Sequence, residues 1–407
     1  MYSLSQVIAG VQFKNPIIIS SGPLTRKTNL LKLAEDHGAA AVSIKHIMTE
    51  QPFRGKSRWY FQPETKTLGV VSEPRLDIDE GEDLIRWARK ETGLVILANM
   101  SGPASIEKWG ETANKLEKAG AHFLELNMTC PNMDAPKDIE SGAKDGKRIA
   151  LGAMIGRDPV LAATVTKCVT EAVKIPVICK LTSVGGAMVQ VGKACEKSGA
   201  AALSMAAGIP GAPHLDIYDQ GKPKVPGIEG KISFGGLGGP WTRLISNRLV
   251  ADLKTEVKIP IIGAGGIWTW QDIVETIMYG STLIEACRSV MYKGFKLVDE
   301  WVKGLQSFME ETGYPDIPAF SGIALKNFCY PKDLQIIPVI AHVNQDECTG
   351  CKKCLDIGHC DAIVVIDKKA NVNKMLCVGC GMCSTICPKS AISMETTPAI
   401  SLNQNRT

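Results

Sequence analysis

The feature that most constrains this chain is a run of cysteines near its end, in residues 348–388. This stretch holds eight cysteines, whereas the 347 residues before it hold only six. Cysteine thiolates are the usual protein ligands of iron–sulfur clusters, and three thiolates spaced two residues apart can hold one face of a cluster. The run therefore predicts that the chain transfers single electrons.

The run is an internal repeat. Its second half has the spacing CxxCxxCxxxCP, typical of bacterial ferredoxins, at Cys377, Cys380, Cys383 and Cys387. Its first half has five residues rather than three before the last cysteine, at Cys348, Cys351, Cys354 and Cys360. In such ferredoxins the fourth cysteine of each half binds the other cluster. We therefore predict two [4Fe-4S] clusters, one held by Cys348, Cys351, Cys354 and Cys387, the other by Cys377, Cys380, Cys383 and Cys360.

A zinc site and a disulfide framework are the alternatives. Zinc sites usually have two CxxC pairs with a longer spacer, and disulfide scaffolds are short and follow a signal peptide. The N-terminal residues lack a charged segment followed by a long apolar run, and no stretch approaches 18 apolar residues. We expect a soluble, cytoplasmic protein. Its net charge of +4 is spread along the chain and gives no indication of nucleic acid binding.

Before the cysteine run, short apolar segments alternate with helical patterns that end at glycine. The strand candidates are residues 17–19, 41–44, 94–98, 123–126, 176–180, 202–205, 260–263 and 283–286. Eight such units favour a (β/α)8 TIM barrel, with an open doubly wound sheet as the alternative. The predicted organisation is a barrel over 1–312, a linker over 313–340, a ferredoxin-like domain over 341–395 and a tail over 396–407.

In a barrel, functional groups belong on the loops that follow the strands. The segments 128–158 and 206–240 are much longer than ordinary loops, which is typical of lids and binding segments. Polar residues stand at several predicted strand ends: Ser20, Gly22, Lys45, Asn127 and Lys180. A charge directly after a buried strand is costly without a partner, so the lysines are candidates for function. Glycines at 235–239 and 263–266 would let backbone N–H groups approach a phosphate.

Taken together, the motifs SSGP, SIKH, LELNMTCP, CKLT, FGGLGGP and GAGGI resemble the FMN barrel of the dihydroorotate dehydrogenase family. With the cysteine run, residues 1–395 resemble the C-terminal, FMN and iron–sulfur portion of dihydropyrimidine dehydrogenase. The resemblance implies that Ser20, Gly22, Lys45, Asn127 and Lys180 contact the flavin. It also implies that the phosphate lies at Gly238, Gly239, Gly265 and Gly266.

The chain departs from dihydropyrimidine dehydrogenases at the substrate. Their cysteine general acid lies in a segment like GLACGQDP, which corresponds here to GAMIGRDP, with Ile155 at the position of the acid. Asparagines that hold the pyrimidine in that family are also missing here, with Ala207 at one of the positions where an asparagine is expected. A buried partner left unpaired costs about 1–3 kcal/mol, so these changes predict a substrate other than uracil or thymine. The candidates for the missing acid are Cys130, His46, His214 and Lys147.

The leading hypothesis is an FMN- and iron–sulfur-dependent oxidoreductase of anaerobic or low-potential metabolism. It would reduce or form a C=C bond in a planar, cyclic substrate. No GxGxxG motif opens a helix after a strand, so electrons should come from or go to a separate subunit or a ferredoxin. A true dihydropyrimidine dehydrogenase subunit with another acid and an electron-transfer subunit without substrate chemistry are the alternatives. The sequence does not determine the oligomeric state, and a homo-oligomer is one of the alternatives.

Overall fold

The computed structural model of the chain describes residues 2–49, 56–102, 105–130, 152–205, 208–225, 232, 234–335 and 337–396, without the side chains of residues 71, 72 and 107. The chain divides into two compact units, Met1–Asn327 and Phe328–Thr407. This boundary falls within the segment that we expected to be a linker. No helix in the described ranges is long and apolar enough to cross a membrane.

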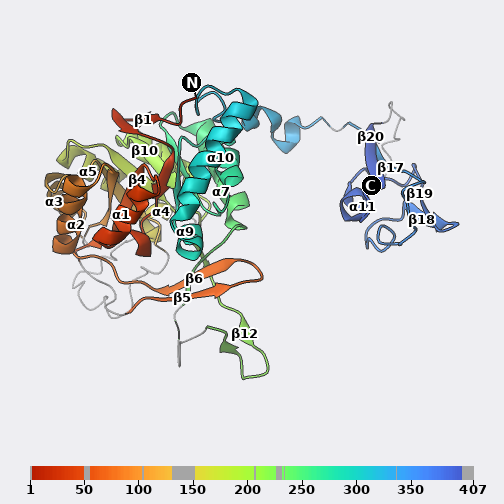
Figure 1. Cartoon of the computed structure of the whole chain (residues 1–407), viewed down its shortest axis with the longest axis horizontal. Helices are drawn as coiled ribbons and strands as arrows, with labels where there is room; N and C mark the ends of the chain where they lie inside the picture. Colours follow the sequence, from red (N-terminus) through yellow and green to blue (C-terminus); the bar gives the residue numbers. More distant parts are fainter. Residues whose placement is uncertain are drawn as a thin grey trace. The chain divides into compact units, whose positions relative to one another are not determined.

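The first unit is a closed barrel of parallel strands (Figure 1). Within the described residues its eight strands are β3 (Ile17–Ile19), β4 (Ala41–Met48), β7 (Val95–Ser101), β8 (Phe123–Met128), β9 (Val177–Leu181), β10 (Ala202–Met205), β15 (Ile261–Ala264) and β16 (Leu283–Ala286). Each coincides with a predicted strand. Because β16 pairs with β3, the sheet closes and the TIM barrel is confirmed over the open sheet.

Helices cover the outside of the barrel (Figure 1). The longer ones are α1 (Thr28–Asp36), α2 (Ile78–Glu91), α3 (Glu107–Lys118), α5 (Pro159–Ala172), α6 (Met188–Lys197), α7 (Thr242–Glu256), α8 (Trp270–Met278) and α10 (Lys296–Thr312). The helix α2 begins at Asp77, whose carboxylate accepts from the backbone N–H of Glu80, while Glu80 accepts from that of Asp77. Such a capping box satisfies two N–H groups that the helix leaves unbonded, so it fixes where α2 starts.

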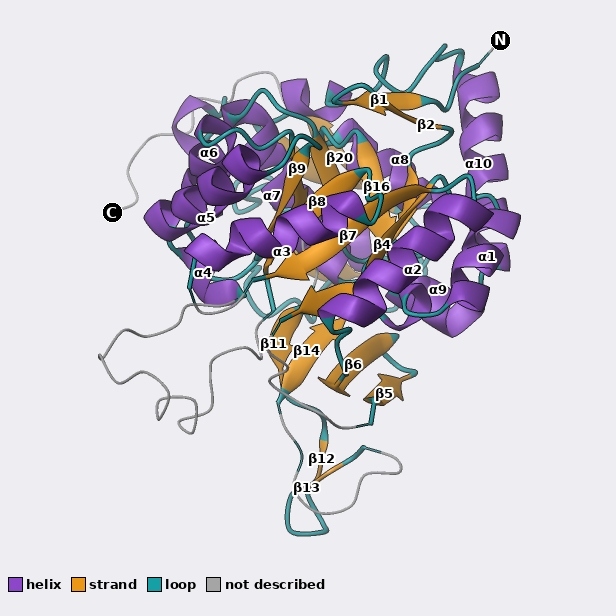
Figure 2. Ribbon diagram, turned by 90° about the vertical axis from the view of Figure 1, so that its left-hand side faces the viewer, coloured by secondary structure: helices purple, strands orange, loops and turns teal. Residues whose placement is uncertain are grey.

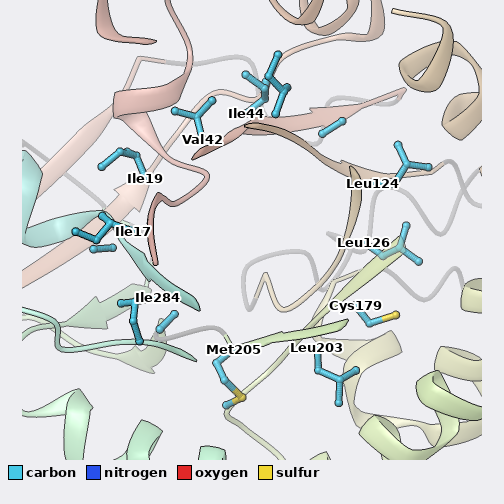
Figure 3. Packing of buried hydrophobic residues seen from close by; sticks show 14 of the residues in the cluster. Ile17, Ile19, Val42, Ile44, Leu124, Leu126, Cys179, Leu203, Met205 and Ile284 are labelled. Atoms are coloured by element: carbon cyan, nitrogen blue, oxygen red, sulfur yellow. The ribbon is translucent and has the colours of Figure 1, made fainter. Parts of the chain in front are cut away.

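The barrel core follows the period of two that strands impose. Side chains such as Ile17, Val42, Leu124 and Leu203 point away from the centre of the strand ring, toward the helices (Figure 3). Their neighbours point inward. Near the amino ends of the strands the inner residues are apolar, with Phe123 and Ile178 in one cluster. Near the carboxyl ends they are polar, which makes this end the place for chemistry.

An antiparallel hairpin packs its side chains into the same inner cluster. It consists of β1 (Gln6–Ile8) and β2 (Val11–Phe13), and both Ile8 and Phe13 are 1% exposed. The ring of Phe13 lies 5.8 Å from that of Phe123 between centroids. The apolar end of the barrel is therefore filled, which leaves the carboxyl end of the strands for a cavity.

Two long connections after barrel strands form a second sheet (Figure 2). The hairpin of β5 (Arg58–Gln62) and β6 (Thr67–Ser72) follows β4, and β11 (Ile209–Gly211) and β14 (Gly235–Gly238) follow β10. They pair in the order β11–β14–β6–β5. The short strands β12 (Leu215–Asp216) and β13 (Lys222–Pro223) form another hairpin. The sequence analysis predicted neither sheet. The first sheet depends on the pairing of β6 with β14, which joins segments more than 150 residues apart, whereas β12 and β13 are neighbours in the chain.

The remaining helices in the described part of the first unit are short. They are η1 (Pro23–Thr25), α4 (Ala153–Arg157), α9 (Arg288–Lys293) and η4 (Ile323–Asn327). Residues 313–327 belong to this unit, where Ile317 and Phe320 are fully buried in the barrel's outer core.

The second unit is built as two similar halves. β17 (Val339–Val343) pairs with β20 (Ile392–Thr396), and β18 (Ile363–Ile366) pairs with β19 (Lys369–Val372). A short helix, α11 (Met382–Ile386), carries Cys383, and η5 (Pro331–Asp333) precedes the first strand. Cysteines make up part of its small core, with Cys354 and Cys383 buried beside Ala341, Ile363 and Ile392.

Candidate functional site

A cluster of buried charges lies inside the carboxyl end of the barrel. Glu125 of β8, Lys180 of β9 and Glu285 of β16 all take inward positions and are at most 6% exposed. The ammonium group of Lys180 lies 3.1 Å from Glu125 Oε1 and also contacts Glu285 Oε2. Ser20, directly after β3, donates to Glu285 Oε2 at 2.6 Å and accepts from Lys180 at 3.2 Å. Three strands and a loop therefore fix the position of Lys180.

The protonation of this cluster follows from its burial. Burial alone would lower the pKa of Lys180, but the carboxylates of Glu125 and Glu285 outweigh it, so the pKa is raised and Lys180 stays cationic. Burial and the nearby charge of Glu125 raise the pKa of Glu285 to about 7. The pKa of Glu125 is lowered despite its burial, because Lys180, Ser43 and Asn99 stabilise its charge. One lysine thus faces one permanent carboxylate and one that titrates near neutral pH.

Asn127 is held by a chain of hydrogen bonds that starts at the same cluster. Asn99 donates to Glu125 Oε2 at 2.6 Å, and Asn127 Nδ2 donates to Asn99 Oδ1 at 3.0 Å. The backbone N–H and hydroxyl of Thr129 both donate to Asn127 Oδ1. With both ends of its amide engaged, Asn127 has one orientation at the cavity wall.

A bulge in β4 turns two consecutive residues toward the cavity. The pairing of β4 with β7 advances three residues on β4, from Ile44 to Ile47, against two on β7. Between these positions Lys45 and His46 both line the cavity, which an unbroken strand would not allow. The sequence predicted that both residues lie at the strand end but not the bulge that brings them together.

Burial lowers the pKa of both Lys45 and His46. Burial lowers the pKa of Lys45 to about 8, although Glu73, whose Oε1 lies 3.5 Å from Lys45 Nζ, partly offsets it. Burial and the charges of Arg75, Lys45 and Lys180 lower the pKa of His46 well below its ordinary value, so its imidazole is neutral. His46 Nε2 lies 2.9 Å from the hydroxyl of Ser101. A neutral, hydrogen-bonded His46 is better suited to positioning than to acting as a cationic acid.

Two functional residues in the segment after β6 were missed from the sequence. Glu73 is buried, approaches Lys45 and accepts from Trp59 Nε1 at 2.6 Å. Arg75 donates to the carbonyl oxygen of Glu73 and, through Nη2, to Cys130 Sγ at 3.3 Å. The sulfur atom of Cys130 thus accepts a hydrogen bond from a guanidinium group, which fixes its position at the cavity wall.

These groups surround one cavity of about 250 Å³ at the carboxyl end of the barrel. The predicted site residues that line it are Ser20, Gly22, Lys45, His46, Asn127, Cys130, Lys180, Gly239, Gly265 and Gly266. Gly238 lies behind this wall, where a Cβ atom would come 2.1 Å from Arg288 Nη1. His214 is exposed beside β12 and does not line the cavity. Lys147 and Ala207 lie outside the described residues.

Glycines form much of one cavity wall for a steric reason. Gly266 has φ +70°, and a Cβ atom there would lie 2.3 Å from the backbone nitrogen of Arg243. At Gly22 it would lie 2.5 Å from Cys287 Sγ. Side chains are excluded from these positions, so a ligand can reach the backbone. Arg288, which also lines the cavity and donates to Gly236 O at 3.4 Å, adds a half-buried cation to this wall.

Ile155 is a core residue. It lies in α4, is 1% exposed and packs in the outer hydrophobic cluster of the barrel rather than against the cavity. The helix is held tightly to the end of β8, because a Cβ atom at Gly156 would lie 2.1 Å from the carbonyl oxygen of Met128. At this position the chain has an apolar packing contact where a proton donor was to be expected.

In the second unit the eight cysteines of the run sort into two sets around two cavities. One cavity is lined by Cys348, Cys351, Cys354 and Cys387. The other is lined by Cys360, Cys377, Cys380 and Cys383. Each set joins cysteines from both halves of the repeat and has the same members as one of the two ligand sets given above; that each set holds a cluster stays a prediction. Among the described residues no group of His, Cys, Asp or Glu converges on a single metal-ion position; the thiols surround a volume instead.

Backbone N–H groups point at several of these sulfur atoms. Ala370 donates to Cys348 at 3.4 Å and Ala391 to Cys387 at 3.3 Å in the first set. Ala341 donates to Cys377 at 3.5 Å in the second. Such bonds stabilise thiolates and raise the reduction potential of a bound cluster. The donor set and its hydrogen bonds therefore fit iron–sulfur clusters.

The sequence signal for the missed residues differs from one to the next. A carboxylate within an otherwise apolar strand, as in LELN and LIEA, could have identified Glu125 and Glu285. Arg288 follows the last barrel strand and could have been found by the same rule as Lys45 and Lys180. Nothing local marks Glu73 or Arg75, because only the path of the β5–β6 segment brings them to the barrel.

Comparison with known proteins gives two family matches and several relatives. The dihydroorotate dehydrogenase family matches residues 3–309, and the 4Fe-4S binding domain matches residues 370–393. The catalytic subunit of dihydroorotate dehydrogenase B (NAD(+)) from Pyrococcus furiosus is 32% identical over 327 residues, covering 80% of this chain and 99% of its own. The NAD-dependent dihydropyrimidine dehydrogenase subunit PreA of Escherichia coli K12 is 25% identical over 361 residues, covering 86% and 84%.

Proposed function

Because the chain belongs to the dihydroorotate dehydrogenase family, we propose that it is an FMN-dependent oxidoreductase with two [4Fe-4S] clusters. It acts on a C–C or C=C bond of a planar, cyclic substrate other than a pyrimidine. The clusters exchange single electrons with a partner, and the flavin collects two for the substrate. The match of a 4Fe-4S binding domain supports the iron–sulfur part.

The observation that carries this proposal is Lys180 at the floor of the cavity. Reduced flavin carries negative charge near N1 and O2, and a fixed cation there stabilises it without reorganisation. Two glutamates and Ser20 hold Lys180 in place, and its raised pKa keeps it charged. Lys45, Asn127 and Ser20 would contact the flavin ring and ribityl chain. The glycine wall at Gly239, Gly265 and Gly266, beside Arg288, would hold the phosphate.

Two observations support a substrate other than a pyrimidine: the expected proton donor is absent, and nearby polar side chains already form hydrogen bonds within the protein. Ile155 is buried in the core and has no proton to give. Asn99 is bound to Glu125 and Asn127, and Ser101 is bound to His46, so neither amide nor hydroxyl is directed to a ligand. A site that recognises a pyrimidine needs such donors and acceptors, and loses about 1–3 kcal/mol for each one left unpaired.

We assign the second proton to Cys130 among the four candidates. It lines the cavity, and the hydrogen bond from Arg75 holds its sulfur atom in place beside the cavity. His46 lines the same cavity but is neutral and bonded to Ser101. His214 lies away from the cavity, and Lys147 is outside the described residues. Cys130 therefore combines position with a means of exchanging a proton.

The electron partner is proposed from the relatives' names and from the chain's own motifs. Both relatives are named as subunits of NAD-dependent enzymes, whereas this sequence carries no GxGxxG dinucleotide motif at the start of a helix. We propose that a second subunit or a ferredoxin exchanges electrons with the clusters. Full turnover of the isolated chain with NADH would contradict this.

An anaerobic reductive titration tests the cofactor content directly. FMN takes up two electrons and each cluster one, so the chain should accept four electrons and contain eight iron atoms. Three electrons and four irons would mean a single cluster. If the purified chain contained no flavin, the proposal that the barrel binds FMN would be wrong.

Two assays separate the alternatives. Robust steady-state turnover of uracil or thymine would identify a dihydropyrimidine dehydrogenase subunit that uses Cys130 in place of the missing acid. An electron-transfer subunit without substrate chemistry would show no spectral change in its reduced flavin with any unsaturated compound. The proposed function requires substrate-dependent reoxidation without pyrimidine turnover.

A further inference from the structure

The two cysteine cavities of the second unit differ in the charge of their walls. The cavity of Cys348, Cys351, Cys354 and Cys387 is lined by Lys352, Lys353 and Lys389, and by no acidic side chain among the described residues. The described lining of the other cavity carries no charge and includes Ile357, Val372 and Met394. One cluster position thus lies among cations and the other among apolar groups.

This difference does not reflect the composition of the unit. Residues 328–396 contain seven lysines and seven acidic residues, so the unit is close to neutral. Lys369 adds a further cation beside the first cavity, where its ammonium group donates to the carbonyl oxygens of Gln345 and Cys348 at 2.6 and 2.7 Å. More than half of the lysines therefore lie at or beside one cavity, whose described lining contains no acidic side chain.

The cations are placed where a partner can reach them. Lys352, Lys353 and Lys389 are exposed, and so is Cys351, which directly precedes Lys352. The exposed Cys351 offers a route from the surface to the cluster position. We call these three exposed lysines the basic rim. They surround the exposed Cys351, through which an electron can reach the cluster position.

We propose that the basic rim of Lys352, Lys353 and Lys389 is the docking surface for an acidic one-electron carrier protein. Opposite charges steer such a carrier onto the rim and hold its redox centre near Cys351. The carrier is then oxidised by one electron and the cluster held by these four thiols is reduced by one, with no bond made or broken. This inference rests on the proposed two-cluster function and adds where the electrons enter.

The test uses the full chain with its clusters and a plant-type [2Fe-2S] ferredoxin as the acidic carrier. Stopped-flow mixing measures how fast reduced ferredoxin reduces the clusters. The wild-type rate should fall as salt is added, since the attraction is screened. The Lys352→Glu/Lys353→Glu/Lys389→Glu variant should react at least about 10-fold more slowly at low salt and lose that salt dependence.

Two controls separate docking from other effects. Lys374→Glu makes one such Lys-to-Glu change at an exposed position before Cys377 that lines neither cavity, and it should leave the rate within about twofold of wild type. Methyl viologen radical, a small cation, should reduce wild type and variants without slowing, and iron content should stay at eight per chain. These measurements also show that the variants keep their clusters.

The outcomes distinguish this inference from the function on which it rests. Iron content below eight in the wild type, or no reduction by viologen, contradicts the two-cluster function itself. If viologen reduces every protein but ferredoxin reacts equally with wild type and the triple variant, or with neither, the docking surface is overturned. A loss as large in Lys374→Glu would also overturn it, because net charge alone would then explain the effect.

Discussion

At the scale of single residues, the site depends on charges that the protein buries and compensates. Lys180 is held between Glu125 and Glu285, and Lys45 lies near Glu73. A buried charge costs several kcal/mol unless it is paired and hydrogen-bonded. The chain therefore gives up stability to keep a permanent cation at the cavity that we propose as the flavin site. Such a cost is typical of functional sites.

The raised pKa of Glu285 predicts a pH dependence of stability. The folded state holds the Glu285 proton more tightly than the unfolded state, because burial and Glu125 raise its pKa to about 7. Its contribution to stability is therefore complete below pH 4.5 and is lost as the pH rises through 7. The free energy of unfolding can be measured in urea on the flavin-free protein. Between pH 4.5 and 8 that of wild type should fall by up to about 3 kcal/mol relative to that of Glu285→Gln. A constant difference across this range would contradict the assignment.

The contact between Arg75 and Cys130 predicts a difference in thiol reactivity. Hydrogen bonds to charged groups contribute about 1.5–3 kcal/mol, so Arg75→Gln should slow alkylation of Cys130 by iodoacetamide about tenfold or more. Peptide mass spectrometry measures the rate at this cysteine alone. Arg86→Gln, on an exposed part of α2, is the matched control and should change nothing. Equal rates in Arg75→Gln and wild type would remove Arg75 from the proposed proton transfer.

At the scale of elements, the local sequence pattern predicted the barrel strands. It did not predict the strands that form within the long connections between them. The strands are apolar runs with a period of two, and all eight lie where the sequence placed them. Glu73 and Arg75 reach the cavity because β6 pairs with β14, far along the chain. Lys45 and His46 share the cavity because of a bulge in β4. Pairing between distant segments and an extra residue in a ladder have no local signature, so the sequence could not predict them.

The glycine wall predicts a steric effect that can be measured against a matched control. Gly10 and Gly266 both have positive φ, but a Cβ atom at Gly10 meets nothing within 4 Å, whereas at Gly266 it meets Arg243 N at 2.3 Å. Gly10→Ala should cost about 1 kcal/mol from backbone strain alone. Gly266→Ala should cost more and lower the FMN content per purified chain. Equal FMN content in both variants would exclude Gly266 from the cofactor wall.

At the scale of the whole molecule, the chain combines two units with different sources of stability. The barrel has a large apolar core, whereas the second unit has a small one that includes Cys354 and Cys383. Small domains commonly depend on a metal centre for folding. The repeat in the sequence predicted how the thiols sort, because the pairing rule for the fourth cysteine is a property of the spacing. The asymmetry of lysines is also local, because Lys352 and Lys353 lie between Cys351 and Cys354 and Lys389 lies two residues after Cys387.

Cluster removal should therefore affect the two units differently. Treatment with a chelator and an oxidant should make residues 328–407 sensitive to protease, while residues 1–327 stay intact and keep their flavin. Limited proteolysis followed by mass spectrometry measures this directly. Equal protection of both units after complete loss of iron would show that the second unit folds without its clusters.

The substrate class can be measured by the reoxidation of the reduced flavin. The chain is reduced anaerobically and mixed with cyclic enones, arenes, uracil and thymine, while the flavin absorbance is followed. A cyclic, unsaturated compound other than a pyrimidine should reoxidise the flavin, and uracil and thymine should not. Rapid reoxidation by uracil or thymine would contradict the proposed substrate class.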